Sequence, residues 1–251
     1  MPGVEGRVAL VTGAGRGIGR TTADLLASRG ARVMAVARTE NELQTLGLDY
    51  VVADLGTPEG CTLAVKETRE RLGPIAILVC NHGIGSAHER VIWEQDPKHW
   101  HETMRINLDG PFFLSRLVVK DMIERGYGRL VFTSSTSAQV AEYAGSAYNS
   151  SKSGLLGLMR SVAQDAGQYG VTSNAVLPGW VRTPMAETSA EAEAEQRGIT
   201  SDEVWVERAA LYPAGRVVTP EEVAEVIVFL ASEKSSGVNG EAITVALGGI
   251  L

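Results

Sequence analysis

The chain has 251 residues, of which 44% are hydrophobic and 21% are charged, as expected for one globular domain with a substantial core. Its 30 acidic and 23 basic side chains give a formal net charge of −7, which repels phosphate backbones and anionic membranes. We therefore expect neither a nucleic-acid nor a membrane partner. Cys61 and Cys80 are too few for a disulfide framework, and no secretory signal is visible, so a cytoplasmic location is predicted.

Short apolar runs alternate with helix-length segments along the whole chain. The runs are RVALVTG (7–13), ARVMAVA (31–37), DYVVADL (49–55), PIAILVCN (74–81), GRLVFTSS (128–135), VTSNAVLP (171–178) and EAITVAL (241–247). Continuous apolar runs of this length are typical of parallel strands buried on both faces. The pattern predicts a Rossmann-like, doubly wound α/β fold of about seven strands, with helices on both faces and a single domain over residues 1–251.

A glycine-rich turn follows the first run, in the sequence TGAGRGIGR at 12–20. Glycine allows the backbone to approach a diphosphate closely, and the start of the following helix stabilises the anion. The strict G-x-G-x-x-G spacing is not met, because Ile18 stands where the third glycine would be. The turn predicts a dinucleotide site, and a turn that serves packing alone is the alternative.

The sequence YNSSK places Tyr148 and Lys152 four residues apart, at the start of a predicted helix. Residues at this spacing lie on the same helical face, so the phenol and the ammonium could point into one space. A surface Tyr covered by a Lys stem is the alternative. The helix is supported by apolar residues recurring along one face at Leu155, Met159, Val162 and Ala166.

Residues 186–212 interrupt the alternation of strands and helices with the acidic sequence ETSAEAEAEQRG followed by SDEVWVERAALY. The segment lies between the sixth apolar run and a helix that starts near Thr219. Long excursions in compact domains are often functional, which favours a lid over a site. A solvated helical excursion is the alternative.

The motifs together resemble those of the short-chain dehydrogenase/reductase family. The matches follow in order over nearly the whole chain: the Thr-Gly-x-x-x-Gly-x-Gly turn, Asp54-Leu55, CNHG (80–83), Asn107 in MRINLDG, FTSS (132–135), YNSSK and LPGWVRTPM (177–185). The departure is Cys80 and His82, where the family usually has Asn and Ala. These two residues lie in the segment that would form one wall of the cofactor site, so we expect the local packing of that wall to differ from the family pattern.

The resemblance implies four catalytic residues. Tyr148 is the general acid/base that exchanges a proton with the substrate oxygen, and Lys152 favours its phenolate form and bonds the nicotinamide ribose. The family spacing selects Ser135, rather than Ser134 or Ser137, to orient the substrate oxygen. Asn107 resembles the family's helical Asn, which holds a water that links Lys152 to solvent.

The resemblance also implies a cofactor site, for which NADP(H) is favoured and NAD(H) is possible. NAD binders usually carry an acid at the end of the second strand, where this chain has Ala37 followed by Arg38. Arg16 and Arg38 can pair a ribose phosphate. The predicted cofactor-binding residues are Gly13, Arg16, Gly17, Ile18, Gly19, Arg38, Asp54, Leu55, Asn81, Gly83, Tyr148, Lys152, Pro178, Gly179, Val181 and Thr183.

The substrate is predicted to be a small neutral or hydrophobic ketone or secondary alcohol. EQRGITSDEV (195–204) resembles a loop of bacterial 3-hydroxybutyrate dehydrogenases, but their carboxylate-binding His and Lys correspond to Ser137 and Gly145 here. The predicted pocket residues are Tyr143, Trp180, Trp205 and Tyr212. His88, His99 and His101 lack ligand-spaced acidic or Cys partners, so no metal site is predicted.

These features predict an NADP(H)-dependent oxidoreductase that interconverts a ketone and a secondary alcohol. The alternatives are an NAD-preferring alcohol or sugar dehydrogenase of the same family and a non-catalytic nucleotide-binding protein. By analogy with the family, a homotetramer is expected. Its contacts would involve helices near 98–125 and 147–169 and the C-terminal sequence ALGGIL.

Overall fold

The computed structural model describes residues 3–87 and 89–249. Within them a parallel sheet of seven strands has the order β3-β2-β1-β4-β5-β6-β7. Each predicted apolar run supplies one strand. The strands are β1 (Val8–Thr12), β2 (Arg32–Ala37), β3 (Asp49–Val52), β4 (Ile75–Cys80), β5 (Gly128–Thr133), β6 (Val171–Pro178) and β7 (Ala242–Val245).

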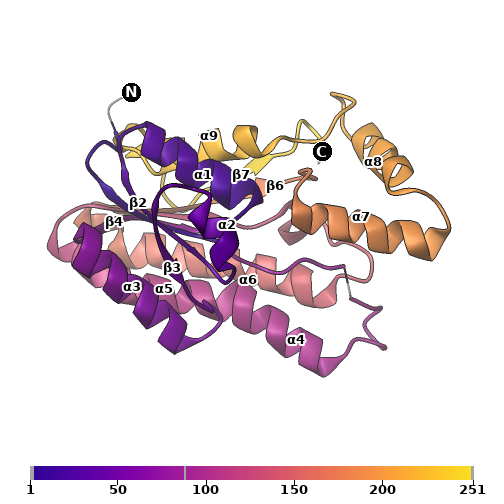
Figure 1. The fold of residues 1–251 in the computed structure, drawn as a ribbon, viewed down its shortest axis with the longest axis horizontal. Helices are drawn as coiled ribbons and strands as arrows, with labels where there is room; N and C mark the ends of the chain where they lie inside the picture. The colour runs from indigo at the N-terminus through magenta and orange to yellow at the C-terminus, as the bar shows by residue number, and fades with distance from the viewer. Residues whose placement is uncertain (1–2, 88, 250–251) are drawn as a thin grey trace.

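Helices cover both faces of the sheet (Figure 1). One face packs against α1 (Gly17–Ser28) and α9 (Pro220–Leu230), and the other against α3 (Pro58–Leu72), α5 (Gly110–Glu124) and α6 (Ser146–Ala166). The short α2 (Glu40–Gln44) follows β2. The predicted doubly wound fold is therefore confirmed. None of the described helices is both long and apolar enough to cross a lipid bilayer.

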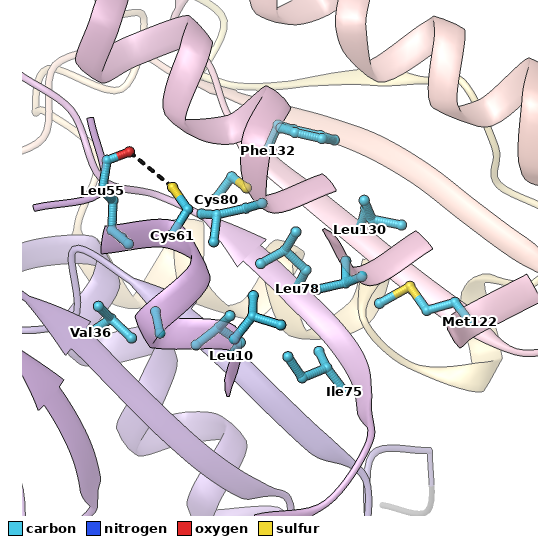
Figure 2. Close-up of a cluster of buried hydrophobic side chains, with 14 of the residues drawn as sticks. Leu10, Val36, Leu55, Cys61, Ile75, Leu78, Cys80, Met122, Leu130 and Phe132 are labelled. Atoms are coloured by element: carbon cyan, nitrogen blue, oxygen red, sulfur yellow. Dashed lines mark hydrogen bonds between the residues drawn. The ribbon is translucent and has the colours of Figure 1, made fainter. Parts of the chain in front are cut away.

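The core between the sheet and the α3–α5–α6 face contains both cysteines (Figure 2). Cys61 and Cys80 are buried free thiols, and the Cys61 Sγ lies 3.3 Å from the Leu55 carbonyl oxygen. Burial raises the pKa of Cys61 to about 12, so the thiol stays protonated at neutral pH. Both side chains act as small apolar core residues.

The strand order reverses between β1 and β4, which makes the carboxyl ends of these two strands the expected place for a ligand. The chain proceeds from β1 outward to β3 and then returns to β4, which pairs with the other side of β1. At such a switch point the loops leaving the carboxyl ends of the strands diverge and open a crevice. The loops after β1, β4, β5 and β6 all leave from this edge.

The long helix expected near 98–125 is interrupted. It begins as α4 (Pro97–Met104), passes through a π-helical turn at Arg105–Asp109 and continues as α5. Single π turns widen the helical backbone and are frequent at functional sites. Asn107 lies at the centre of this turn and is buried.

The 186–212 segment forms two helices beside the sheet, α7 (Pro184–Arg197) and α8 (Ser201–Ala210), as Figure 1 shows. They share a small apolar cluster of their own, formed by Ala190, Ala194, Val204 and Trp205. Thr200 caps α8 with a reciprocal bond to Glu203, and Thr219 caps α9 in the same way with Glu222. Whether the two helices act as a lid stays a prediction.

Candidate active site

The glycine turn lines one cavity at the carboxyl ends of the strands. Gly13 and Gly17 have φ values of 63° and 56°, which favour glycine. A Cβ on Gly13 would lie 2.9 Å from the His82 Cα, so the turn packs directly against the loop after β4. Arg16 precedes α1 without a capping side-chain bond, which leaves the first N–H groups of the helix for an anion. These features fit the diphosphate of a dinucleotide.

Gly19 has a packing role. A Cβ there would lie 2.2 Å from the Gly13 carbonyl oxygen and 2.4 Å from the Asn81 Nδ2. Its missing side chain therefore lets α1 approach the strand ends. The other predicted cofactor-binding residues line the cavity: Gly13, Arg16, Gly17, Ile18, Arg38, Asp54, Leu55, Asn81, Gly83, Tyr148, Lys152, Pro178, Gly179, Val181 and Thr183.

Two arginines reach the cavity at the ends of β1 and β2, but their surroundings differ. Arg16 forms an ion pair with Glu42, with 3.7 Å between Nη1 and Oε1. In the described part of the chain, Arg38 forms neither a hydrogen bond nor an ion pair, although it lines the same cavity. Arg38 is therefore the guanidinium that is open to an anionic ligand. The sequence had not indicated the role of Glu42.

His82, the main departure from the family motif, is held in the cavity wall. Its Nδ1 lies 2.8 Å from the Thr12 Oγ1, and its buried Nε2 has no hydrogen-bond partner among the described residues. Burial lowers its pKa to about 3, and the Lys152 charge acts in the same direction. His82 therefore stays neutral at physiological pH, and Thr12, at the end of β1, fixes its ring.

Tyr148 and Ser135 meet in the same cavity from α6 and from the loop after β5. Ser134 donates its hydroxyl to the Lys152 carbonyl oxygen at 2.9 Å, and the Ser137 hydroxyl donates to Glu142 at 2.6 Å. The Ser135 Oγ lies 2.9 Å from the Ser137 Oγ, and of the three serines only Ser135 contributes to the pKa of Tyr148, which it lowers. The predicted pair is thus brought together.

Contrary to the expectation that Lys152 favours the phenolate, the pKa of Tyr148 is not lowered in this structure. Burial raises the pKa of Tyr148 to about 12 and Glu142 adds to the rise, while the Ser135 bond acts in the opposite direction. The Lys152 Nζ lies 5.6 Å from the Tyr148 ring centroid and donates to the Thr133 carbonyl oxygen at 2.9 Å. Burial is the largest cause of the rise at Tyr148, and it also lowers the pKa of Lys152 to about 8.

Asn107 contacts the protein backbone. Its Oδ1 accepts from the Ile84 N–H at 2.8 Å, and its Nδ2 donates to the Ile84 carbonyl oxygen at 3.0 Å and to the Ser151 Oγ at 3.1 Å. The π turn thereby fixes the loop after β4 against the helix that carries Tyr148. Asn107 does not line the cavity, and its role in a proton relay stays a prediction.

The sequence did not reveal Glu89, which anchors the start of α6. This buried carboxylate accepts from the backbone N–H of Ala147 at 2.9 Å and of Tyr148 at 2.5 Å. The residue before α6, Gly145, has no side chain with which to cap the helix. Glu89 supplies this cap from a distant loop, and no local sequence signal marks such a contact.

Only one of the four predicted pocket aromatics reaches the cavity. Trp180 lines it, beside Pro184, Met185 and Ala186. Tyr143 is 88% exposed, and Trp205 is buried in the α7–α8 cluster. The Tyr212 hydroxyl accepts from the backbone N–H of Trp180 at 2.6 Å, so Tyr212 supports the backbone of the cavity wall without lining the cavity. Of the other three rings, Trp205 and Tyr212 are buried in the protein and Tyr143 is exposed to solvent.

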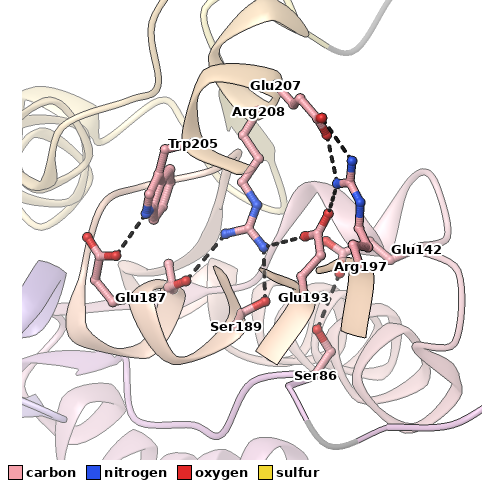
Figure 3. A network of polar contacts seen from close by, with 10 residues as sticks. Ser86, Glu142, Glu187, Ser189, Glu193, Arg197, Trp205, Glu207 and Arg208 are labelled. Atoms are coloured by element: carbon pink, nitrogen blue, oxygen red, sulfur yellow. Dashed lines mark hydrogen bonds and ion pairs between the residues drawn. The ribbon is translucent and has the colours of Figure 1, made fainter. Parts of the chain in front are cut away.

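Arg208 holds α7 to α8 (Figure 3). Its guanidinium lies 3.6 Å from the Trp180 ring centroid and forms a 2.9 Å ion pair with Glu193. His99 and His101 lie on α4, and His88 is outside the described residues. No group of three potential metal ligands gathers anywhere in residues 3–87 and 89–249.

Comparisons with known proteins agree with this fold. A family model described as Enoyl-(Acyl carrier protein) reductase matches residues 13–249. The 3-oxoacyl-[acyl-carrier-protein] reductase of Escherichia coli (strain K12) is 32% identical over 248 residues, covering 96% of both chains. The D-beta-hydroxybutyrate dehydrogenase of Cupriavidus necator is 33% identical over 247 residues, covering 94% of this chain and 95% of that protein.

A solved structure of an actinorhodin polyketide ketoreductase variant with NADPH has a TM-score of 0.93 and 32% identity, and all of both chains are covered. Use of NADP(H) is therefore found among the relatives of this chain. The doubly wound fold, the glycine turn and the YNSSK helix were predicted above from the sequence. The chain belongs to the short-chain dehydrogenase/reductase family and is an NAD(P)-dependent oxidoreductase acting on CH–OH and C=O groups.

Proposed function

We propose that the protein is an NADP(H)-preferring carbonyl reductase in which Tyr148 donates the proton. The observation that carries the proposal is the convergence of Tyr148, Ser135 and Lys152 on the cavity that also contains the glycine turn and Arg38. With its pKa raised to about 12, the Tyr148 phenol is protonated at neutral pH. A protonated phenol is an acid, which is what ketone reduction requires.

Tyr148 and Ser135 would hold the carbonyl oxygen between their hydroxyl groups and so orient the carbonyl carbon. The nicotinamide, when bound, supplies the hydride to that carbon. The Tyr148 O–H proton moves to the oxygen, which becomes the alcohol. The buried Lys152 ammonium, 5.6 Å from the ring centroid, then stabilises the phenolate until a new proton arrives. Arg38 would bond the ribose phosphate that distinguishes NADP(H) from NAD(H).

A panel of neutral ketones tests the proposal, with loss of NADPH or NADH absorbance as the measurement. We expect turnover of at least one apolar ketone and a higher kcat/KM with NADPH than with NADH. An equal or higher value with NADH would favour the NAD-preferring alcohol or sugar dehydrogenase. Cofactor affinity without turnover of any ketone would favour the non-catalytic nucleotide-binding protein.

The rate of reduction should depend on pH through Lys152. Because burial lowers its pKa to about 8, the ammonium is present at lower pH and is lost as the pH rises through that value. We expect kcat/KM for reduction to be level from about pH 6 to about pH 8 and to fall above it. His82, with a pKa of about 3, should add no transition in this range. A single transition near pH 6 to 7 would contradict this assignment.

Two further predictions concern the assembly and the location of the enzyme. We propose a homotetramer that uses the α4–α5 and α6 surfaces, which size-exclusion chromatography with light scattering would test. The last residues of ALGGIL lie outside the described residues. The cytoplasmic location likewise stays a prediction.

A further inference from the structure

The substrate end of the cavity contains an acidic corner at Glu142 that the sequence did not indicate. Glu142 precedes α6 and lines the cavity together with Ser86, Ser135 and Tyr148. The charge of its carboxylate contributes to the raised pKa of Tyr148, so the two groups interact electrostatically. An acid therefore stands within the electrostatic range of the atom that would transfer the proton.

Bonds to the catalytic helix hold Glu142 in place. The Asn149 Nδ2, one residue after Tyr148, donates to the Glu142 carbonyl oxygen at 3.0 Å, and its Oδ1 lies 3.4 Å from the Glu142 N–H. The Ser86 Oγ approaches the carboxylate from the loop after β4, at 3.4 Å (Figure 3). Two segments that also build the reaction centre, α6 and the loop after β4, thus hold Glu142 in place.

A directed chain of hydrogen bonds connects Glu142 to Ser135. The Ser137 hydroxyl donates to the Glu142 Oε1 at 2.6 Å, and the Ser135 Oγ lies 2.9 Å from the Ser137 Oγ. A carboxylate can only accept, and Ser137 has one proton, so Ser135 must be the donor to Ser137. Glu142 is therefore the final acceptor of this chain, and it keeps the Ser137 bond when the Ser135 hydroxyl rotates to donate to a substrate oxygen as proposed above. Because a carboxylate only accepts, the Glu142 corner recognises hydrogen-bond donors.

No cation compensates for this acid inside the substrate end. Among the described residues Glu142 forms no ion pair, and Lys152, the cation lining this end, donates to the Thr133 carbonyl oxygen. Arg208 lies behind Trp180 and pairs with Glu193. Arg208 and Glu142 interact through space without an ion-pair contact. An anionic substrate would therefore meet a like charge at Glu142, whereas a hydroxyl or ammonium group would gain a charge-assisted bond. The cavity lining also includes the apolar side chains of Trp180, Met185 and Ala186.

We propose that Glu142 is a specificity-determining residue, and that it selects ketones with an apolar body and a nearby hydroxyl or ammonium group over ketoacids. This inference rests on the proposed carbonyl reduction and narrows its substrate class. It narrows the expected neutral or hydrophobic substrates to those with a hydrogen-bond donor, because the Glu142 carboxylate can only accept hydrogen bonds. It also gives a physical reason, beyond the missing clamp at Ser137 and Gly145, why a small hydroxy acid does not fit.

Four aryl ketones test the inference, each assayed with NADPH: propiophenone, α-hydroxyacetophenone, β-aminopropiophenone and benzoylacetate. Propiophenone carries a methyl group where α-hydroxyacetophenone carries its hydroxyl. We expect the donor-bearing ketones to exceed propiophenone in kcat/KM by about tenfold or more, and benzoylacetate to be the poorest substrate. Comparing kcat/KM for α-hydroxyacetophenone with that for β-aminopropiophenone shows whether the pocket prefers a neutral hydroxyl or a charged ammonium donor.

The isosteric variant Glu142→Gln should reduce the preference for the donor-bearing ketones over benzoylacetate by about tenfold or more, with the larger change for the ammonium compound. Glu70→Gln, the same change at an exposed position on α3, should leave all four ratios unchanged. Wild-type preference for benzoylacetate, or unchanged ratios in Glu142→Gln, would overturn the inference and leave carbonyl reduction standing. No turnover of any ketone would instead overturn the proposed function.

Discussion

Replacing Tyr148 by Phe should lower kcat for ketone reduction by about 10²- to 10⁴-fold, the range for loss of a positioned general acid. The substitution removes one oxygen and leaves the ring packed at the start of α6, where the Tyr148 N–H is bonded to Glu89. Affinity for NADPH should stay within about threefold, because a ribose contact from this hydroxyl would be a single neutral bond. Stopped-flow single-turnover reduction and NADPH fluorescence titration measure the two quantities.

Tyr143→Phe is the matched control. It makes the same chemical change five residues earlier in the chain, on a ring that is 88% exposed and does not line the cavity. This control variant should reduce ketones at the wild-type rate. If Tyr148→Phe also retained that rate, another group would have to donate the proton, and the proposed role of Tyr148 would be wrong.

Replacing Arg38 by Gln should lower kcat/KM with NADPH by about 10- to 100-fold and leave kcat/KM with NADH nearly unchanged. The range follows from losing one charge-assisted bond worth about 1.5–3 kcal/mol. Arg38 is the guanidinium at this end of the cavity that has no ion-pair partner in the described part of the chain, whereas Arg16 is paired with Glu42. Steady-state kinetics with both cofactors give the ratio.

Arg32→Gln supplies the control, since Arg32 is an exposed arginine at the opposite end of the same strand, β2. It should leave the NADPH-to-NADH ratio unchanged. An unchanged ratio in Arg38→Gln would mean that Arg38 does not read the ribose phosphate. Arg16→Gln should have a smaller effect than Arg38→Gln, because Glu42 already neutralises part of its charge.

The strands and the glycine turn could be predicted from the sequence because their signals are local. Parallel strands buried on both faces need continuous apolar runs, and every such run became a strand. The position of Tyr148 relative to Lys152 is likewise local, since four residues on a helix return to the same face. Ser135 was selected through the family spacing, and the hydrogen bonds of Ser134 and Ser137 explain why the neighbouring hydroxyls are engaged elsewhere.

The electrostatics of the site could not be predicted in this way. The sequence suggested that Lys152 keeps the pKa of Tyr148 low, but burial and the Glu142 carboxylate raise it. The burial of Tyr148 depends on which loops cover it, and the charge of Glu142 acts on Tyr148 through space. The same reason explains the pocket aromatics: Trp205 lies in the α7–α8 cluster and Tyr212 behind Trp180, because apolar rings pack wherever tertiary contacts exclude water.

By itself, the sequence determined the order of strands and helices, the dinucleotide turn and the pairing of a phenol with an ammonium on one helix. Each of these depends on residues close together in the chain. Only the tertiary structure decided that Glu89 caps the catalytic helix, that Glu42 engages Arg16, and that Glu142 lines the cavity that contains Tyr148. Those three carboxylates act on groups contributed by other segments, and their partners are set by the paths of the loops across the sheet edge.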